Sequence, residues 1–203
     1  MADQKTEVKP KRALCDKCAR PLKVCICDAL TELQASVDVI IWQDPTEAKH
    51  KLSTAPLLNL SIKNSRLLVG ESFDFVDIFS DSAAGECALL YPLQDGEELQ
   101  EGNKQQIKKL LILDGTWRKV RRLFHLNPWL AKLSYINLNP DFQSQYRIRK
   151  SPREDGLSTI EAGVAALSWL DNQQNYKPIL SVLEKMVQIQ EKNTPVNKPK
   201  TRK

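Results

Sequence analysis

The sequence contains only two histidines, His50 and His125, and neither stands in a metal-binding or catalytic-triad pattern. It also lacks both common glycine-rich phosphate loops, G-x-G-x-x-G and G-x-x-x-x-G-K-[S/T]. Serine–histidine hydrolysis, catalysis by a histidine-bound metal and nucleotide binding through either loop are therefore disfavoured.

Long apolar runs are missing as well. No segment approaches the ~18 continuous apolar residues of a membrane-spanning helix. The charged N-terminus, MADQKTEVKPKRAL, has no apolar stretch after it, unlike a secretory signal. Hydrophobic residues still make up 41% of the 203 residues, which is enough for a sizeable core. We therefore expect a soluble, cytoplasmic protein with one main domain and a small appendage.

The net charge of +5 is unevenly distributed. Residues 192–203, KNTPVNKPKTRK, contain five basic residues and no acidic one, so the rest of the chain is neutral overall. We expect this tail and residues 1–12 to be disordered. A basic tail can gather polyanions without sequence preference, but many soluble proteins have such tails, so its contact with RNA is left open.

Two further basic clusters lie inside the chain. One falls on a predicted helix and the other in a predicted loop: Arg118, Lys119, Arg121 and Arg122, and then Arg147, Arg149, Lys150 and Arg153. Either cluster can be interpreted as solvated surface charge. Their position beside the motifs described below favours contact with RNA.

Four of the five cysteines fall within 13 residues, in CDKCARPLKVCIC. Their spacing, C-x2-C, six residues and C-x-C, lets two close pairs converge on one tetrahedral Zn²⁺: Cys15, Cys18, Cys25 and Cys27. Disulfides are the competing explanation, but a chain without an export signal does not favour them, and Cys25 and Cys27 are too close for relaxed bridge geometry. Four sulfur ligands leave no position for water, so we predict a structural zinc module over residues 13–30. Cys87, the fifth, is expected to be a buried strand residue.

From residue 36 onward, apolar segments of strand length alternate with helical patterns. The predicted strands are 36–42, 66–70, 87–92, 110–114 and 134–138. The predicted helices are 47–62, 73–80, 101–109, 116–126, 159–172 and 178–192. Continuous apolar strands are typical of a parallel sheet that helices cover on both faces. We therefore expect an open α/β sheet whose ligands bind beyond the carboxyl ends of the strands.

Two segments predict a helix start that could serve such a site. LLILDGTWRKVRRLF reads as a buried strand, a turn at Gly115 and a helix, and LSTIEAGVAAL carries a Ser158–Glu161 capping-box pattern. A purely structural interpretation is adequate for each, with Asp114 and Ser158 as caps and Trp117 in the core. Both helix starts also present N–H groups and hydroxyls that suit a carboxylate, and an indole face suits a sulfonium. An amino-acid-bearing cofactor is the functional alternative.

Taken in order, the cysteine cluster, the DGTW turn and the Y-R-x-R…L-S-T-x-E-A segment resemble the DTW-domain family over about residues 13–190. The resemblance implies a tRNA-uridine aminocarboxypropyltransferase related to the SPOUT methyltransferases, with tRNA as partner and S-adenosylmethionine as cofactor. It implies a DTW domain over residues 31–191, with a SPOUT-like open parallel sheet and a C-terminal trefoil knot. The cofactor-binding residues that it implies are Thr54, Tyr91, Pro92, Asp114, Thr116, Trp117, Tyr146, Arg147, Ser158, Thr159 and Glu161.

The chain departs from the family pattern after its first core strand. Asp44-Pro45-Thr46-Glu47 has aspartate where the family usually has histidine, and Ser53-Thr54-Ala55 replaces an Asn-Thr-Gly-like step. Glu47 and Thr54 are retained, so we expect this segment still to approach the cofactor. A direct role for position 44 is left open.

The resemblance also implies the reaction, transfer of the 3-amino-3-carboxypropyl group to N3 of a uridine. Attack by N3 requires near-attack geometry and removal or sharing of its proton, and Asp114 is the candidate base. An aspartate with an ordinary pKa near ~3.9 is a weak base for an imide, so Asp114 is either a base or an orienting group. The alternative functions are a SPOUT-type RNA methyltransferase and a non-catalytic, zinc-containing RNA-binding module.

Overall fold

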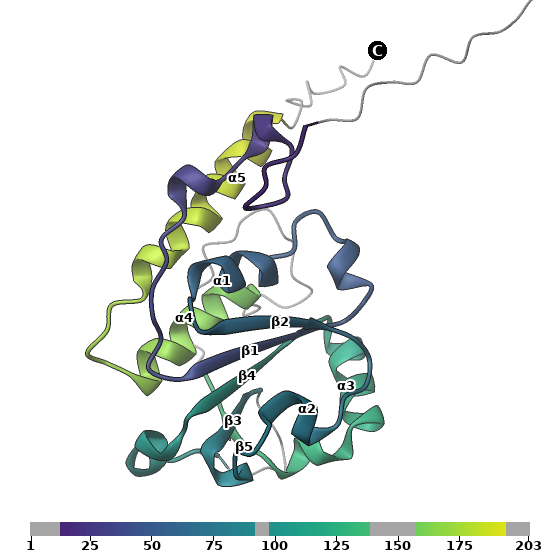
Figure 1. The fold of residues 1–203 in the computed structure, drawn as a ribbon, viewed down its shortest axis with the longest axis vertical. Coiled ribbons are helices and arrows are strands. Elements are labelled where there is room, and N and C mark those ends of the chain that lie inside the picture. Colours follow the sequence, from purple (N-terminus) through teal and green to yellow (C-terminus); the bar gives the residue numbers. More distant parts are fainter. Residues whose placement is uncertain (1–12, 92–97, 139–156, 194–203) are drawn as a thin grey trace, which may run out of the picture.

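The centre of the molecule is an open sheet of five parallel strands, as the apolar segments predict (Figure 1). The structure, a computed structural model, describes residues 13–91, 98–138 and 157–193. The strands are β1 (Asp38–Gln43), β2 (Ser65–Val69), β3 (Cys87–Leu90), β4 (Lys109–Asp114) and β5 (Ser134–Ile136). Their spatial order is β2-β1-β4-β3-β5, so β1 and β4 are neighbours in the middle of the sheet.

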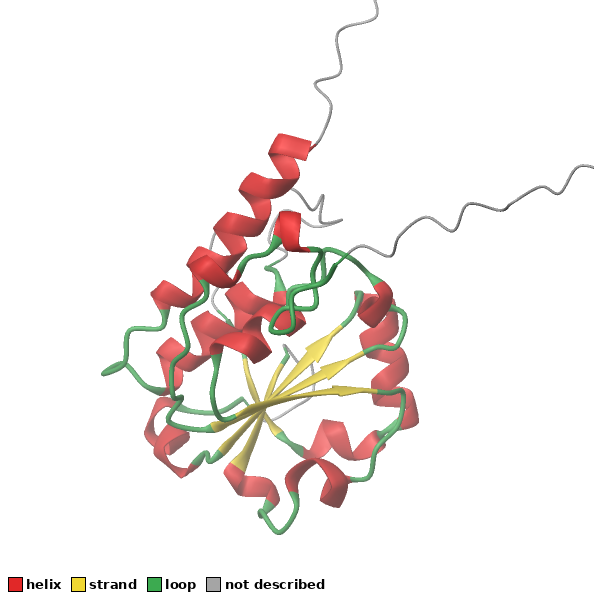
Figure 2. Ribbon diagram, turned by 45° about the horizontal axis from the view of Figure 1, so that its top comes forward, coloured by secondary structure: helices red, strands yellow, loops and turns green. Residues whose placement is uncertain are grey.

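Helices cover both faces of this sheet (Figure 2). The α-helices are α1 (Ala55–Ser61), α2 (Phe75–Phe79), α3 (Trp117–Leu126), α4 (Thr159–Leu170) and α5 (Ser181–Asn193). Short 3₁₀ helices are η1 (Leu22–Val24), η2 (Cys27–Ala29), η3 (Glu47–Lys49), η4 (Ala84–Glu86), η5 (Glu101–Gln106), η6 (Pro128–Lys132) and η7 (Lys177–Leu180). None of the helices described here is long and apolar enough to cross a membrane.

The two faces of the sheet form two different cores, because successive strand residues point to opposite sides. Val39 and Ile41 of β1 belong to an aliphatic core with residues of α1, α4 and α5. Ile40 and Trp42 belong to a second core with α2, α3 and η6, in which Trp42 lies edge-on to Phe73 with ring centroids 5.0 Å apart. Burial on both faces explains why the strands lack apolar–polar alternation.

Helix α4 lies close against α1 because one of its residues has no side chain. A Cβ atom placed on Gly163 would stand 2.5 Å from Cδ2 of Leu58, a residue of α1 that is itself fully buried. Glycine costs helix stability relative to alanine, so its use here indicates that close helix approach is required.

Two helix predictions need correction. The segment 47–62 is not one helix: η3 ends at Lys49, and α1 begins only at Ala55. Pro56 explains this, since proline within a helix removes a hydrogen bond and clashes with the preceding turn, whereas it fits the first turn. The segment 101–109 is the 3₁₀ helix η5, because the chain turns extended at Ile107, which is buried in the aliphatic core.

The cysteine-containing segment packs against the last helix (Figure 1). Ser181 Oγ donates to the carbonyl of Ala29 (2.8 Å), and Lys185 Nζ forms an ion pair with Asp28 (2.6 Å). Ile26 is fully buried in the aliphatic core. The implied trefoil knot depends on the connection between β5 and α4, and residues 139–156 of that connection lie outside the described residues.

Candidate active site

The carboxyl ends of β1 and β4 form the topological switch point of the sheet. After β1 the chain passes to α1 on the aliphatic face, and after β4 it passes to α3 on the other face. Connections that leave neighbouring strands in opposite directions open a crevice at the carboxyl edge. Gln43 of β1 and Asp114 of β4 lie opposite each other in the strand register at this edge. The sequence placed Asp114 at a strand end, and the topology places that end at the crevice.

Asp114 is the centre of a buried polar network. It is only 5% exposed. Its Oδ2 accepts a hydrogen bond from Gln43 Nε2 (2.6 Å), which also donates to Ser53 Oγ (2.7 Å). Its Oδ1 accepts a hydrogen bond from Thr159 Oγ1 at the start of α4. The two predicted helix starts therefore meet in space, joined by the Thr159–Asp114 contact.

The structure does not support the interpretation of Asp114 as a helix cap. Thr116 is the N-cap of α3, and the Asp114 carboxylate faces β1 and α4 instead. Trp117 is also not a core residue, since it is 42% exposed. The centroid of its ring lies 5.6 Å from the centroid of the Tyr91 ring. The Tyr91 centroid lies 5.0 Å from that of Phe124. Burial raises the pKa of Tyr91, which therefore stays neutral.

The start of α4 has the capping box that its sequence predicts. Ser158 and Glu161 are both buried, and Glu161 Oε2 accepts hydrogen bonds from the backbone N–H (2.9 Å) and the Oγ (2.6 Å) of Ser158. The first N–H groups of a helix have no acceptor within the helix. Together with the Thr159 hydroxyl, they make this helix start a polar wall of the site.

Thr54 stands apart from this network. Its side chain is 3% exposed, and Thr54 Oγ1 has no hydrogen-bond partner, a situation unique among the buried side-chain nitrogens and oxygens of the described residues. A buried hydroxyl without a partner costs free energy unless another molecule satisfies it. Thr54 follows Ser53, which is bonded to Gln43, so the residue with the unpaired hydroxyl directly adjoins the Asp114 network along the chain.

Asp44 and Glu47 bracket Lys119. Lys119 Nζ lies 2.9 Å from Glu47 Oε1 and 3.9 Å from Asp44 Oδ1. Burial alone would raise the pKa of Asp44, but hydrogen bonds from the side chain and backbone of Thr46 and the charge of Lys119 outweigh it and lower the pKa. Position 44 is thus an ionised residue of the same edge, next to Asp114, whose carbonyl accepts the Asp44 N–H (3.0 Å).

The remaining predicted site residues divide into two groups. Pro92, Tyr146, Arg147, Arg149, Lys150 and Arg153 lie outside the described residues. On α3, Arg118 and Arg121 are exposed, whereas Arg122 pairs with Glu71 (2.7 Å) and Lys119 with Glu47. Contact of these basic residues with RNA stays a prediction. Gln43 and Ser53 were missed, although a glutamine that directly follows the apolar segment 36–42 is a recognisable signal of a strand end at a polar site.

The four clustered cysteines converge, as their spacing predicts. Their sulfur atoms all lie within 4.8 Å of one another, with Cys15 and Cys27 3.6 Å apart and Cys18 and Cys25 3.8 Å apart. A tetrahedron with metal–sulfur bonds of about 2.3 Å has edges of about 3.8 Å, so this donor set fits zinc. Backbone N–H groups of Cys18 and Lys17 lower the pKa of Cys15 to about 6, whereas burial and neighbouring sulfurs raise that of Cys27 to about 12.

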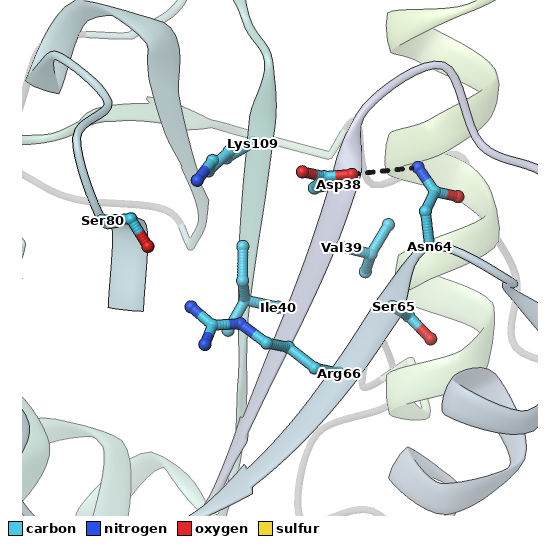
Figure 3. A pocket seen from close by; sticks show the side chains of 8 residues that line it. All are labelled: Asp38, Val39, Ile40, Asn64, Ser65, Arg66, Ser80 and Lys109. Carbon is cyan, nitrogen blue, oxygen red and sulfur yellow. Dashed lines mark hydrogen bonds between the residues drawn. The ribbon is translucent and has the colours of Figure 1, made fainter. Parts of the chain in front are cut away.

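A cavity of about 310 Å³ lies at the opposite, amino edge of the sheet (Figure 3). Its two cationic side chains bind the carbonyls that end α2: Lys109 Nζ donates to Phe79 O (2.7 Å), and the guanidinium of Arg66 donates to Ile78 O. These contacts satisfy a helix C-terminus. None of the predicted site residues is at this edge, so we assign the candidate site to the carboxyl edge, where the buried polar network lies.

An open parallel sheet with helices on both faces and a buried polar network at its switch point places the protein in the doubly wound α/β class. Within that class, the chain belongs to the DTW-domain family, whose model matches residues 12–191. No solved structure matches the chain.

Three curated relatives carry informative names. The chain is 31% identical over 179 residues to tRNA-uridine aminocarboxypropyltransferase 2 of Drosophila melanogaster, covering 84% of this chain and 71% of the relative. It is 30% identical to the protein of the same name in Macaca fascicularis, covering 82% of this chain but only 59% of that relative. It is 25% identical to tRNA-uridine aminocarboxypropyltransferase A of Arabidopsis thaliana, covering 94% and 85%. The chain thus spans less than two thirds of the macaque relative.

Proposed function

We propose that this chain transfers the 3-amino-3-carboxypropyl group of S-adenosylmethionine to N3 of a uridine in tRNA, forming acp3U. Membership of the DTW-domain family and the names of the curated relatives support the reaction class. The observation that carries the proposal is the Thr159–Asp114 hydrogen bond, because it joins two distant motifs into one polar site at the switch point.

The residues of this site fit the methionine end of S-adenosylmethionine. The unpaired hydroxyl of Thr54 and the N–H groups at the start of α4 are donors for its carboxylate. The carboxylates of Asp114 and Glu161 offset its positive charges. When bound, S-adenosylmethionine would supply a carbon that its sulfonium makes electrophilic. The new bond would join that carbon to uridine N3, the electron pair of the broken carbon–sulfur bond would stay on sulfur, and neutral 5′-methylthioadenosine would leave. The N3 proton would pass to Asp114 or to water.

The four clustered cysteines would hold a structural zinc ion. All four positions of a tetrahedral zinc would be filled by sulfur, which leaves none for substrate or water. The ion would fix the segment that packs on α5 through Ser181 and Lys185. Its contribution is therefore to the fold and not to the reaction.

The tRNA would approach the carboxyl edge along the exposed arginines of α3. Arg118 and Arg121 lie near the half-buried Tyr91 and the exposed Trp117 at this edge. Arginines bind phosphates, and aromatic rings stack on unpaired bases. We also propose that the chain has the C-terminal trefoil knot of SPOUT-like proteins, which its membership of the DTW-domain family supports.

The direct test is incubation of the purified protein with S-adenosylmethionine and unmodified tRNA, followed by mass spectrometry of the nucleosides. The proposal requires uridine bearing the aminocarboxypropyl mass. A methylated uridine would instead support the alternative function, a SPOUT-type RNA methyltransferase, and would contradict the proposal. Calorimetry with S-adenosylmethionine separates the remaining case, since a non-catalytic RNA-binding module would bind tRNA and not the cofactor.

A further inference from the structure

We infer that Gln43 is a positioning residue that fixes the carboxylate of Asp114, so that Asp114 acts as an oriented acceptor at the carboxyl edge of the sheet. The inference rests on the proposed function for its kinetic consequence, but its structural part concerns residues of this chain alone. Gln43 was not among the residues that the sequence motifs single out, and it is the last residue of β1, directly opposite Asp114.

The contacts of Gln43 are specific. Its side chain is 1% exposed, and its Nε2 uses both hydrogens, one on Asp114 Oδ2 (2.6 Å) and one on Ser53 Oγ (2.7 Å). The orientation of the amide is dictated by chemistry, because the opposite orientation would set the amide oxygen against a carboxylate oxygen. Because both N–H groups of this buried amide donate to side chains of other segments, Gln43 links β1 to β4 and to the segment before α1.

Asp114 is held from two sides. Gln43 binds Oδ2 and Thr159 binds Oδ1, so the carboxylate plane is fixed and one donor contacts each oxygen. A carboxylate has about four acceptor positions, and the described residues use two of them in these two contacts. Fixed acceptors whose orientation is set before the ligand arrives lose nothing to reorganisation during a reaction.

Gln43 also controls the neighbour of the orphan hydroxyl. Ser53, its second acceptor, immediately precedes Thr54, whose Oγ1 has no partner. The same amide therefore sets the position of Asp114 and of the segment that presents Thr54. An apolar side chain of equal size would fill the space at Gln43 but would hold neither.

Two substitutions separate positioning from packing. Gln43→Leu keeps the volume and removes the donors. Gln43→Glu places two carboxyl groups within hydrogen-bond distance, which must share a proton. At low pH the shared proton replaces the amide hydrogen as a donor to Asp114, and at high pH the two charges repel. Asn64→Leu is the matched control, since the Asn64 amide binds the carbonyls of Ala35 and Val37 at the amino edge.

The kinetic readout is the transfer rate of each variant relative to the unsubstituted protein between pH 6 and 9. We expect Gln43→Leu to be at least about tenfold slower at every pH. The relative rate of Gln43→Glu should fall by at least about tenfold as the pH rises, because the shared proton is lost. Asn64→Leu should keep the normal rate at every pH. Normal rates in both Gln43 variants, or a pH-independent ratio for Gln43→Glu, would overturn the inference.

The second readout needs neither cofactor nor tRNA. In Gln43→Glu, the like charge of Asp114 raises the pKa of the pair in the folded state, so its stability is retained at low pH and lost as pH rises through the folded value. The melting temperature relative to the unsubstituted protein should therefore fall with increasing pH. A parallel melting profile would refute the Gln43–Asp114 contact. If the unsubstituted protein transfers nothing to tRNA, the proposed function fails, and this melting experiment still tests the contact.

Discussion

The two edges of the central sheet are both polar, but their polar groups do different things. At the amino edge, Arg66 and Lys109 bind carbonyls that end α2, so side chains satisfy the backbone of a single neighbouring helix. At the carboxyl edge, Gln43 and Asp114 bind side chains from separate segments, and the nearby hydroxyl of Thr54 is left without a partner.

The difference shows how a structural polar contact can be told from a site. The amino edge has the clearer cavity, about 310 Å³, yet its cations are already engaged. The carboxyl edge has a buried network and, next to Ser53 in the chain, the unsatisfied hydroxyl of Thr54, which is costly unless another molecule satisfies it. A set of polar groups that comes from several elements and includes an unsatisfied group indicates a functional site better than the volume of a cavity does.

The largest expected effect lies away from both edges, at the cysteine cluster. Removing the metal with a chelator, or replacing Cys27→Ser, should lower the free energy of unfolding by on the order of 4–5 kcal/mol, since loss of a structural metal is among the most destabilising changes. Thermal melting with metal analysis measures this. Cys87→Ala is the control and should keep one zinc per chain, because Cys87 is buried in β3, outside the cluster. Stoichiometric zinc in Cys27→Ser would contradict the assignment.

The next effect is on the reaction at the carboxyl edge. Asp114→Asn and Asp114→Ala should slow transfer by about 10²–10³-fold, the range for a group that assists in the transition state. Nucleoside analysis gives the rate, and melting curves show whether the fold survives. Asp38→Asn, at the amino end of β1, is the matched control and should transfer at the normal rate. Full activity in both Asp114 variants would end the proposal, whereas a collapsed melting temperature would indicate a structural role.

A smaller effect is expected from the orphan hydroxyl. Thr54→Val keeps the shape of the side chain and removes a group without a protein partner. The free energy of unfolding of the ligand-free protein should therefore rise by about 1 kcal/mol, because the buried unpaired hydroxyl is removed. The affinity for S-adenosylmethionine should fall about tenfold, equivalent to one hydrogen bond to a charged group. Scanning calorimetry measures the stability, and titration calorimetry measures the affinity for S-adenosylmethionine. The control is Ser61→Ala, which removes the hydrogen bond from Ser61 Oγ to Leu57 O inside α1. It should lower the free energy of unfolding and leave the affinity for S-adenosylmethionine unchanged. Unchanged affinity in Thr54→Val would remove Thr54 from the site.

The smallest effect is expected at the amino edge. Lys109→Met should cost about 1 kcal/mol or less of unfolding free energy, because it removes one cation from a helix C-terminus. Urea denaturation gives the stability, and the transfer rate should stay normal. If Lys109→Met lost transfer activity while its stability stayed intact, the amino edge would take part in the reaction, and the assignment of the site to the carboxyl edge alone would be wrong.

Much of the fold follows from periodicity. All five strands were predicted within a few residues, because continuous apolar segments such as β1 and β4 indicate burial on both faces. The capping box at Ser158 is equally local, and the structure has it. The prediction of one helix over 47–62 was wrong, because Pro56 allows a helix to begin but not to continue through it.

The site was predicted only in part, because it depends on contacts between distant segments. Asp114 was identified by its place after a strand, but its partners Gln43 and Thr159 come from other elements 71 and 45 residues away. No local pattern states that two segments meet. Likewise, Asp114 was interpreted as a possible cap because its sequence position allows it, and only the fold shows its carboxylate turned toward β1 and α4.

Gly163 has a consequence for the whole site. The bare backbone at this position lets α4 rest against Leu58, and the start of α4 carries Thr159 to Asp114. A methyl group added at Gly163 would clash with Leu58, so either the Leu58 side chain or α4 would have to shift, and a shift of α4 would move Thr159 relative to Asp114. The position of Thr159 in the candidate site therefore depends on how closely a glycine further along the same helix lets α4 approach α1.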